Sequence, residues 1–382
     1  MIFIPYLLRS NAILQRDKVT TFWGYTDPQQ RVELDYDNRH LETSATSDGY
    51  FQFELAPHAA SGSITFTLTS GTDQVTSKNV LFGDVWLLSG QSNMQLWMQR
   101  LVARYPDEIE NAKDTDIHFF MVPQRYDFSH GDSELDSGKW QIAVGKNIEM
   151  LSGIGYFYAQ LQRRATHVPI GLISTAIGGT PIRSWVSHKT LTAMEELPQN
   201  FDKLSDQSFI NGYVSENDHY QKYYERVCDR SDQGILKDWT QANVDDSRWD
   251  SLPLDGEDWP EMYRQPGTIW IRKHLRMPAR LVGKSAEFRL GTFVDADETY
   301  LNGQKIGETG YQYPPRNYRI SSLPAEITLV VRLHIFSAPG GPRFGKKHLL
   351  ITDEESVDLD AQGDWLVKRG CWLPPKKESV FP

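Results

Sequence analysis

The chain has few cysteines, and their placement excludes two kinds of architecture. Only Cys228 and Cys371 occur among its 382 residues. They stand far apart in the sequence, and no other metal-ligating residues are spaced around them as they are in zinc sites. We therefore expect neither a disulfide framework nor a structural zinc, and we interpret both cysteines as free thiols.

Long apolar runs and an excess of positive charge are also lacking. No stretch is long enough to span a bilayer. Residues 1–9 carry no basic leader and are interrupted by Pro5, so no signal-peptide core is expected. The net charge of −10 argues against nucleic acid and anionic membranes as partners. We expect a cytoplasmic protein without a nucleic-acid or membrane partner.

Short alternating stretches fill residues 1–80, and the chain is long enough for two or three domains. The period of two between apolar and polar residues, with glycine-containing turns between the stretches, predicts antiparallel hairpins. The stretches are Val19–Gly24, Arg31–Tyr36, Tyr50–Leu55 and Ser63–Thr69. We predict an N-terminal β-sandwich over residues 1–80.

Strands and helices alternate between residues 81 and 230. Val85–Leu88, Ile117–Val122 and Val168–Ser174 are apolar enough for buried strands. Ser152–Arg164 has helical periodicity, with Ser152 as the N-cap. Its expected apolar face consists of Ile154, Phe157, Tyr158 and Leu161. Strand–helix–strand units at this spacing predict a parallel sheet covered by helices.

Two turns follow strands of this sheet. After Val85–Leu88, a strand bounded by Gly83 and Gly90, the chain enters a turn in which Ser92 would stand at a helix N-terminus. Unpaired amides there favour negative charge, which suits a nucleophile, although Ser92 as a simple helix cap is the alternative. After Val168–Ser174, the Gly178-Gly179 pair allows a backbone amide to approach a ligand, and an ordinary strand-to-helix turn is the alternative.

Both turns resemble signature blocks of a known family. Gly83-Asp-Val-Trp with Ser89-Gly-Gln-Ser-Asn-Met94, and then Ala176-Ile-Gly-Gly-Thr180, are similar to the first and second blocks of the sialate O-acetylesterases, which are SGNH hydrolases. The resemblance implies that Ser92 is the nucleophile and that the Ser92 and Gly178 amides form the oxyanion hole, with Gly179 as the fallback. Gly90, Gln91 and Asn93 support the motif. It implies hydrolysis of O-acetyl esters of sialic acid or a related sugar, without a metal or an organic cofactor.

One part of the family pattern is not found. The family's Gly-Glu-Ser-Asn block and its general-base Asp-x-x-His pair do not occur after Trp365. Asp37-Asn-Arg-His40 has that spacing, but it precedes the serine in a hairpin region, so we interpret it as coincidence. His219 we interpret as part of a solvated helix face. We therefore expect an esterase that is impaired as this chain alone and is completed by a second chain or a homo-oligomer, with an unpaired sheet edge and an exposed apolar face.

Alternating stretches return from Trp239 onwards. Asn302-Gly303 between two of them is a strong type I′ hairpin signal. The stretches are Trp239–Trp249, Gly267–Arg276, Ala286–Gly291 and Glu298–Gly307. This region resembles a galactose-binding-like jelly roll, for which a scaffold role or sugar binding are both open.

These observations predict an α/β protein with an incomplete SGNH-type (flavodoxin-like) three-layer core. The predicted division is a β-sandwich over 1–80, the first part of the hydrolase domain over 81–230, an inserted jelly roll over 231–362 and a tail over 363–382. Two other functions stay open. One is an acetylxylan-type or other carbohydrate esterase, because the turns do not encode the sugar, and the other is a non-catalytic carbohydrate-binding protein.

Overall fold

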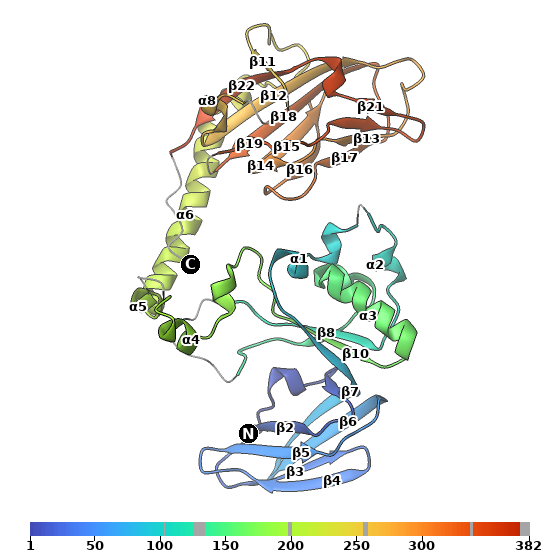
Figure 1. Cartoon of the computed structure of the whole chain (residues 1–382), viewed down its shortest axis with the longest axis vertical. Helices are drawn as coiled ribbons and strands as arrows, with labels where there is room; N and C mark the ends of the chain where they lie inside the picture. Colours follow the sequence, from blue (N-terminus) through green and yellow to red (C-terminus); the bar gives the residue numbers. More distant parts are fainter. Residues whose placement is uncertain are drawn as a thin grey trace. The chain divides into compact units, whose positions relative to one another are not determined.

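The computed structural model describes residues 1–102, 104–125, 128, 134–197, 201–254, 259–336 and 339–374. The chain divides into two compact units, residues 1–207 and 208–381. Both units combine sheets with helices (Figure 1), so the α/β class predicted from the sequence is confirmed. Within the described residues, no helix has the length and apolar character needed to cross a membrane.

The first unit is built on an eight-stranded sheet with the order β4-β3-β6-β7-β10-β8-β9, in which β1 also pairs with β7. A second sheet pairs β2 with β5. The strands are β1 Ile13–Gln15, β2 Thr20–Tyr25, β3 Arg31–Tyr36, β4 Arg39–Ser44, β5 Tyr50–Leu55, β6 Ser61–Ser70, β7 Asp73–Leu88, β8 Ile117–Met121, β9 Trp140–Ile142 and β10 Ile170–Ser174. The helices and 3-10 turns are η1 Tyr6–Leu8, α1 Ser92–Gln95, η2 Met98–Arg100, α2 Glu108–Asn111, η3 Gly145–Met150, α3 Gly153–Thr166, η4 Ile182–Trp185, α4 His188–Ala193 and α5 Phe201–Leu204.

Strand β7 is the longest strand of this unit, with 16 residues (Figure 1). Its first part pairs antiparallel with β6, and Asp84–Leu88 pairs parallel with β10. The sequence suggested that the strand begins after Gly83, but β7 runs through this glycine without a break. A Cβ at Gly83 would lie 2.1 Å from the Pro169 carbonyl oxygen, so glycine serves here to admit a neighbouring backbone rather than to end a strand. The predicted boundary at 80/81 therefore falls inside one continuous strand.

The last residues of β7 form an edge of the sheet. Among the described residues, β10 is their strand partner on one side, while on the other side the Val85 N–H donates to Oε1 of Gln15 at 3.0 Å. Trp86 and Leu87 are 43% and 64% exposed. The prediction of a parallel strand is confirmed, but the prediction that this strand is buried is wrong for Trp86 and Leu87.

Helix α3 lies on the sheet and is capped as predicted, because the Ser152 hydroxyl accepts from the Gly155 N–H at 3.1 Å. The predicted apolar face is wrong for Ile154 and Leu161, while Phe157 packs against the core. Ile154 and Leu161 are 52% and 63% exposed, whereas Tyr156 is 1% exposed. A Cβ at Gly155 would lie 2.4 Å from Leu88, so the helix approaches the sheet closely at this glycine. Tyr156 and Phe157 also contact the apolar cluster of the sheet, while Ile154 and Leu161 turn outwards.

The second unit contains a six-stranded sheet with the order β11-β22-β12-β18-β15-β16 and a four-stranded sheet with the order β17-β13-β20-β21. Its strands are β11 Asp250–Leu252, β12 Gly267–Arg276, β13 Ala286–Arg289, β14 Phe293–Val294, β15 Ala296–Leu301, β16 Gln304–Thr309, β17 Asn317–Ile320, β18 Glu326–Ile335, β19 Gly341–Pro342, β20 Leu349–Ile351, β21 Ser356–Asp358 and β22 Trp365–Trp372. Its helices are α6 Gln207–Ser231, which begins at the unit boundary, α7 Gln233–Leu236, α8 Glu261–Arg264 and η5 Asp360–Gln362.

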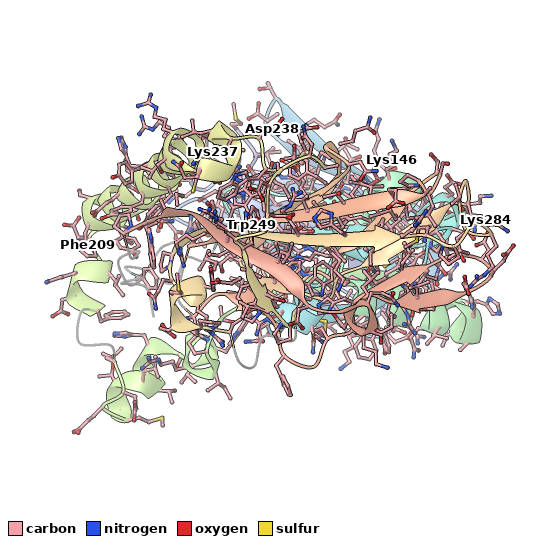
Figure 2. All side chains as sticks on the ribbon, turned by 90° about the horizontal axis from the view of Figure 1, so that it is seen from above. Lys146, Phe209, Lys237, Asp238, Trp249 and Lys284 are labelled. Carbon is pink, nitrogen blue, oxygen red and sulfur yellow. The ribbon has the colours of Figure 1, made fainter. Side chains whose placement is uncertain are left out.

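Several predictions for this unit can be compared with the structure. Asn302 and Gly303 have φ angles of 48° and 85°, so the predicted hairpin is confirmed. Residues 239–249 form turns rather than a strand. Trp249, labelled in Figure 2, shares a buried apolar cluster with Trp239 and with Trp270 of β12, and the Trp239 ring packs edge-on against both. Residues 365–372 were predicted to belong to a tail. They form β22, which pairs with β12, so this sheet extends past residue 362.

The two cysteines lie together in the second unit. Cys228 of α6 and Cys371 of β22 are both free thiols, as predicted, and both are buried in one apolar cluster with Tyr224 and Leu373. The Thr268 hydroxyl lies 3.4 Å from Sγ of Cys371. The hydrogen bond to Cys371 and burial both raise the pKa of the Cys228 thiol.

Candidate active site

The two turns predicted to form a site meet at one edge of the first unit's sheet. Leu88, near the end of β7, is in register with Ser174, the last residue of β10, and the strands run parallel. Past the ladder, the Thr175 N–H donates to the Leu88 carbonyl and the Ile177 N–H donates to the Gly90 carbonyl, both at 3.0 Å. The turn after β7 is thus fixed directly against the turn after β10.

Ser92 is exposed and is the first residue of α1 rather than its cap. The cap position belongs to Gln91, whose side chain makes no capping hydrogen bond. The hydroxyl of Ser92 instead donates to Oε1 of Gln91 at 3.2 Å. The interpretation of Ser92 as a helix cap is therefore wrong, and its hydroxyl is available at the surface. Asn93, which follows it, is also exposed.

The Gln91 carboxamide joins the two turns. Its Nε2 donates to the Thr180 carbonyl at 3.1 Å. Because a carbonyl oxygen can only accept, this contact fixes the orientation of the amide, and Oε1 must face Ser92. The Thr180 side chain in turn accepts from Nε1 of Trp185 at 3.0 Å. Gln91 was predicted to support the motif, and the structure places it between the serine and the second turn.

Gly178 lies beside Ser92. An ideal Cβ on Gly178 would stand 3.7 Å from Oγ of Ser92 and 2.7 Å from Oε1 of Gln95. The Gly178 N–H donates to that same Gln95 oxygen at 2.8 Å. Gly179 has a φ of 85° and no atom within 4 Å of its ideal Cβ position. The structure thus places Gly178 next to Ser92, whereas a side chain at position 179 would point into unoccupied space.

Gln95 was missed in the sequence. It stands four residues after Gln91, so both carboxamides leave the same face of the turn at α1. The spacing of four residues between Gln91 and Gln95 was the one sequence feature that could have indicated a role for Gln95. The contact itself depends on how the turn after β10 folds back towards α1, which brings the Gly178 N–H to Gln95.

The Asp-x-x-His match before the serine is not a pair in the structure. Asp37 Oδ2 lies 2.9 Å from Nε2 of His58, whereas His40 lies 2.8 Å from Asp35. The interpretation of Asp37 and His40 as a coincidence therefore agrees with their contacts.

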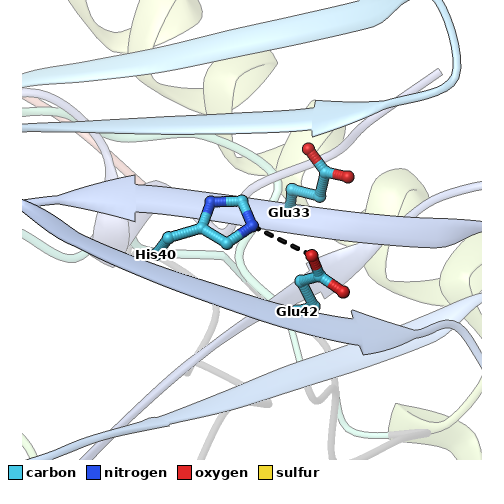
Figure 3. A group of neighbouring side chains, drawn as sticks. All are labelled: Glu33, His40 and Glu42. Carbon is cyan, nitrogen blue, oxygen red and sulfur yellow. Dashed lines mark hydrogen bonds and ion pairs between the residues drawn. The ribbon is translucent and has the colours of Figure 1, made fainter.

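Glu33, His40 and Glu42 form the group of potential metal ligands found among the described residues (Figure 3). Arg31 forms ion pairs with both Glu33 and Glu42. Hydrogen bonds to Asp35 and Glu42 raise the pKa of His40 and favour its protonated form, which cannot bind a metal. This surface group is better described as a network of ion pairs on β3 and β4.

His219 and His118 each lie in an element that the structure describes. His219 is exposed on α6 in the second unit, as predicted for a solvated helix face, while His130 lies outside the described residues. His118 is fully buried in β8, and its ring nitrogens lie 2.6 Å and 3.0 Å from the carbonyl oxygens of Asn11 and Thr115.

Comparison with known proteins defines the class of the segment that carries these turns. Residues 82–212 match the family model described as carbohydrate esterase, sialic acid-specific acetylesterase. The segment includes Ser92, Gln95 and Gly178. The mouse sialate O-acetylesterase is 30% identical over 147 residues, and that of Pongo abelii is 24% identical over 196 residues. Residues 82–212 therefore match the sialate O-acetylesterase family, as the signature blocks suggested.

The extent of these matches is limited. They cover 37% and 49% of this chain but only 26% and 37% of the mouse and Pongo abelii relatives, so the chain matches between a quarter and two fifths of each relative's length. Among solved structures, a carbohydrate acetylesterase from Xanthomonas citri is 28% identical, with a TM-score of 0.49, and the match covers 52% of this chain and 45% of that one.

Proposed function

We propose that this protein is a serine carbohydrate esterase that removes O-acetyl groups from sialic acid or a related sugar. The observation that carries the proposal is the position of the exposed Ser92 hydroxyl, 3.7 Å from the ideal Cβ point of Gly178, in two turns held together by backbone hydrogen bonds. Ser92 loses its proton to a base and attacks the acetyl carbonyl; the bond from the acetyl carbon to the sugar oxygen breaks, the sugar leaves as an alcohol that takes up the proton, and an acetyl-serine remains. Water then cleaves the acetyl-serine to acetate and free Ser92.

The amides of Ser92 and Gly178 are proposed as the oxyanion hole, and Gly179 stays the fallback. A tetrahedral intermediate on Ser92 would place its oxygen between the two turns, where backbone N–H groups can hold it. Each such donor can contribute about 3 kcal/mol to transition-state stabilisation. Gly178 is favoured because it is the glycine beside Ser92.

The proposed proton acceptor comes from outside the described residues. The Ser92 hydroxyl has Gln91 as its hydrogen-bond partner within the described part of the chain, and a neutral carboxamide cannot take up the serine proton. We assign this role to a histidine on a further polypeptide segment, from this protein, a second chain or another copy. The edge of β7 supports this assignment, because exposed Trp86 and Leu87 are suited to cover by an added strand.

The same proposal includes the fold around the site. Residues 81–230 would form the first part of an SGNH-type core, with the two sheets of the second unit as an inserted galactose-binding-like jelly roll. The parallel β7-β10-β8 order supports the first statement, and the two sheets around one apolar core support the second.

Fluorophosphonate labelling tests the proposal, since this probe requires an activated serine. We expect Ser92 to be labelled, Ser92→Ala to lose labelling and Ser89→Ala, which removes an exposed hydroxyl three residues earlier, to keep it. The chain is assayed alone and mixed with the remaining part of a sialate O-acetylesterase relative. Absence of labelling in both conditions would favour a non-catalytic carbohydrate-binding protein.

The sugar is tested separately by acetate release. O-acetylated sialic acid is compared with acetylated xylan at equal acetyl concentration. Faster release from sialic acid is expected, and preference for xylan would move the protein to an acetylxylan-type activity.

A further inference from the structure

We propose that Gln95 closes the oxyanion hole of the unliganded chain and must leave it before an acyl group can react. This inference rests on the proposed function, because it concerns the same amide of Gly178. It adds a residue that controls access to that amide.

The contact has the geometry expected of a bound oxyanion. Oε1 of Gln95 accepts from the Gly178 N–H at 2.8 Å, within the 2.7–3.1 Å at which oxyanion donors act. The same oxygen lies 2.7 Å from the ideal Cβ point of Gly178, and Oγ of Ser92 lies 3.7 Å from that point. The side-chain oxygens of Gln95 and Ser92 therefore both lie close to the same point beside Gly178.

The orientation of the Gln95 carboxamide is fixed by its partner. A backbone N–H can only donate, so the oxygen of Gln95, and not its nitrogen, must face Gly178. The amide is thereby satisfied in the absence of substrate.

A neutral carboxamide is a weaker acceptor than a developing oxyanion. Hydrogen bonds to an ionised acceptor are roughly twice as strong as those between neutral groups. The acyl oxygen can therefore replace Gln95 most readily as it becomes negative, while neutral ligands must compete with Gln95 on equal terms. The cost of displacing Gln95 opposes every ligand of the hole.

Removing the Gln95 side chain should then strengthen anion binding. A neutral hydrogen bond contributes a net amount that corresponds to about three- to tenfold in an equilibrium constant. We expect Gln95→Ala to bind acetate, the carboxylate product, three- to tenfold more tightly than the wild type. Gln99→Ala, which removes an exposed carboxamide from the neighbouring turn, is the matched control and should leave the affinity unchanged.

The amide of Gly178 can be observed directly by NMR in the full chain. Labelling isoleucine carbonyls with ¹³C and glycine nitrogens with ¹⁵N selects the amides of four Ile–Gly pairs. These pairs are Ile154–Gly155, Ile170–Gly171, Ile177–Gly178 and Ile306–Gly307. Ile177→Val identifies the Gly178 signal, because only that pair is lost.

The experiment measures the Gly178 signal in the wild type, Gln95→Ala and Gln99→Ala, first alone and then with increasing acetate. Support consists of a shifted Gly178 signal in Gln95→Ala without ligand, together with the tighter acetate binding. An unchanged Gly178 signal in Gln95→Ala, or equal acetate affinity in the wild type and Gln95→Ala, overturns the inference. Because acetate binding needs no activated serine, tighter binding without fluorophosphonate labelling would reject the esterase mechanism and keep the role of Gln95.

Discussion

Exchanging the two adjacent glycines of the second turn for alanine separates the proposed oxyanion donor from its fallback. In Gly178→Ala, the new methyl group would stand 2.7 Å from Oε1 of Gln95 and 3.6 Å from Cα of Ser92. The close contact is with the end of a flexible side chain, which can rotate away. In Gly179→Ala, the methyl group meets no atom within 4 Å, but the residue has a φ of 85°.

We therefore expect Gly178→Ala to lose labelling but keep its stability, and Gly179→Ala to lose stability but keep its labelling. Gly178→Ala keeps its backbone N–H and keeps its stability within about 0.5 kcal/mol, typical of an exposed substitution. Its methyl group, 3.7 Å from Oγ of Ser92, occupies the space that the oxyanion needs, so we expect the labelling rate to fall about 100-fold, as much as when one oxyanion donor is lost. Gly179→Ala loses about 1–2 kcal/mol of stability because alanine is strained at positive φ. Its labelling rate should stay within about threefold of the wild type, since the methyl group points away from any contact.

Two measurements decide the comparison. The second-order rate constant of fluorophosphonate labelling reports the site, and urea unfolding reports stability. If Gly179→Ala loses labelling and Gly178→Ala keeps it, the oxyanion donor is Gly179. If both variants label as the wild type does, the second turn takes no part in stabilising the oxyanion, and the reasoning from the Cβ distances is refuted.

Three further predictions concern parts of the molecule outside the candidate site. Gly83→Ala should cost about 3 kcal/mol in urea unfolding, because its Cβ would lie 2.1 Å from the Pro169 carbonyl oxygen, and wild-type stability would show that β7 and β10 are not this close. Burial lowers the pKa of His118, so the unfolded state binds a proton first as the pH falls, and stability should decrease as the pH drops through about 6.5. His118→Gln should reduce that decrease between pH 7.5 and pH 5.5, and an identical decrease in both proteins would contradict this. Cys228 and Cys371 should react with Ellman's reagent only after urea unfolding, because both are buried, and rapid reaction of the native chain would contradict their burial.

The meeting of the two turns could be predicted from the sequence, because it depends on local rules. Strands that run parallel end at the same edge of a sheet, so a turn containing Ser92 and a turn containing Gly178 had to lie near each other if both followed neighbouring strands. The contact between Gly178 and Gln95 could not be predicted, since it depends on how far the second turn folds back over α1.

Other features were decided by contacts between distant residues. Gly83 has the sequence character of a strand boundary, but the backbone of Pro169 approaches it, and the strand continues. The periodicity of α3 indicates a helix, but the packing of Gly155 against Leu88 decides which face is buried, and it turns Ile154 outwards. Sequence patterns describe single elements well, while the choice of face and the length of a strand depend on its neighbours.

The continuity of β7 means that residues 1–80 cannot be removed as a separate module. A chain that began after Val80 would keep the serine turn but would lose the first half of β7, together with β6 and β1, which pair with residues 73–82 and 81–83 of that strand. Homologous sequences that share the serine turn but differ before it would then need another way to anchor that strand. Residues 1–80 thus support the strand that leads to Ser92, and substitutions of their buried side chains should alter the position of Ser92.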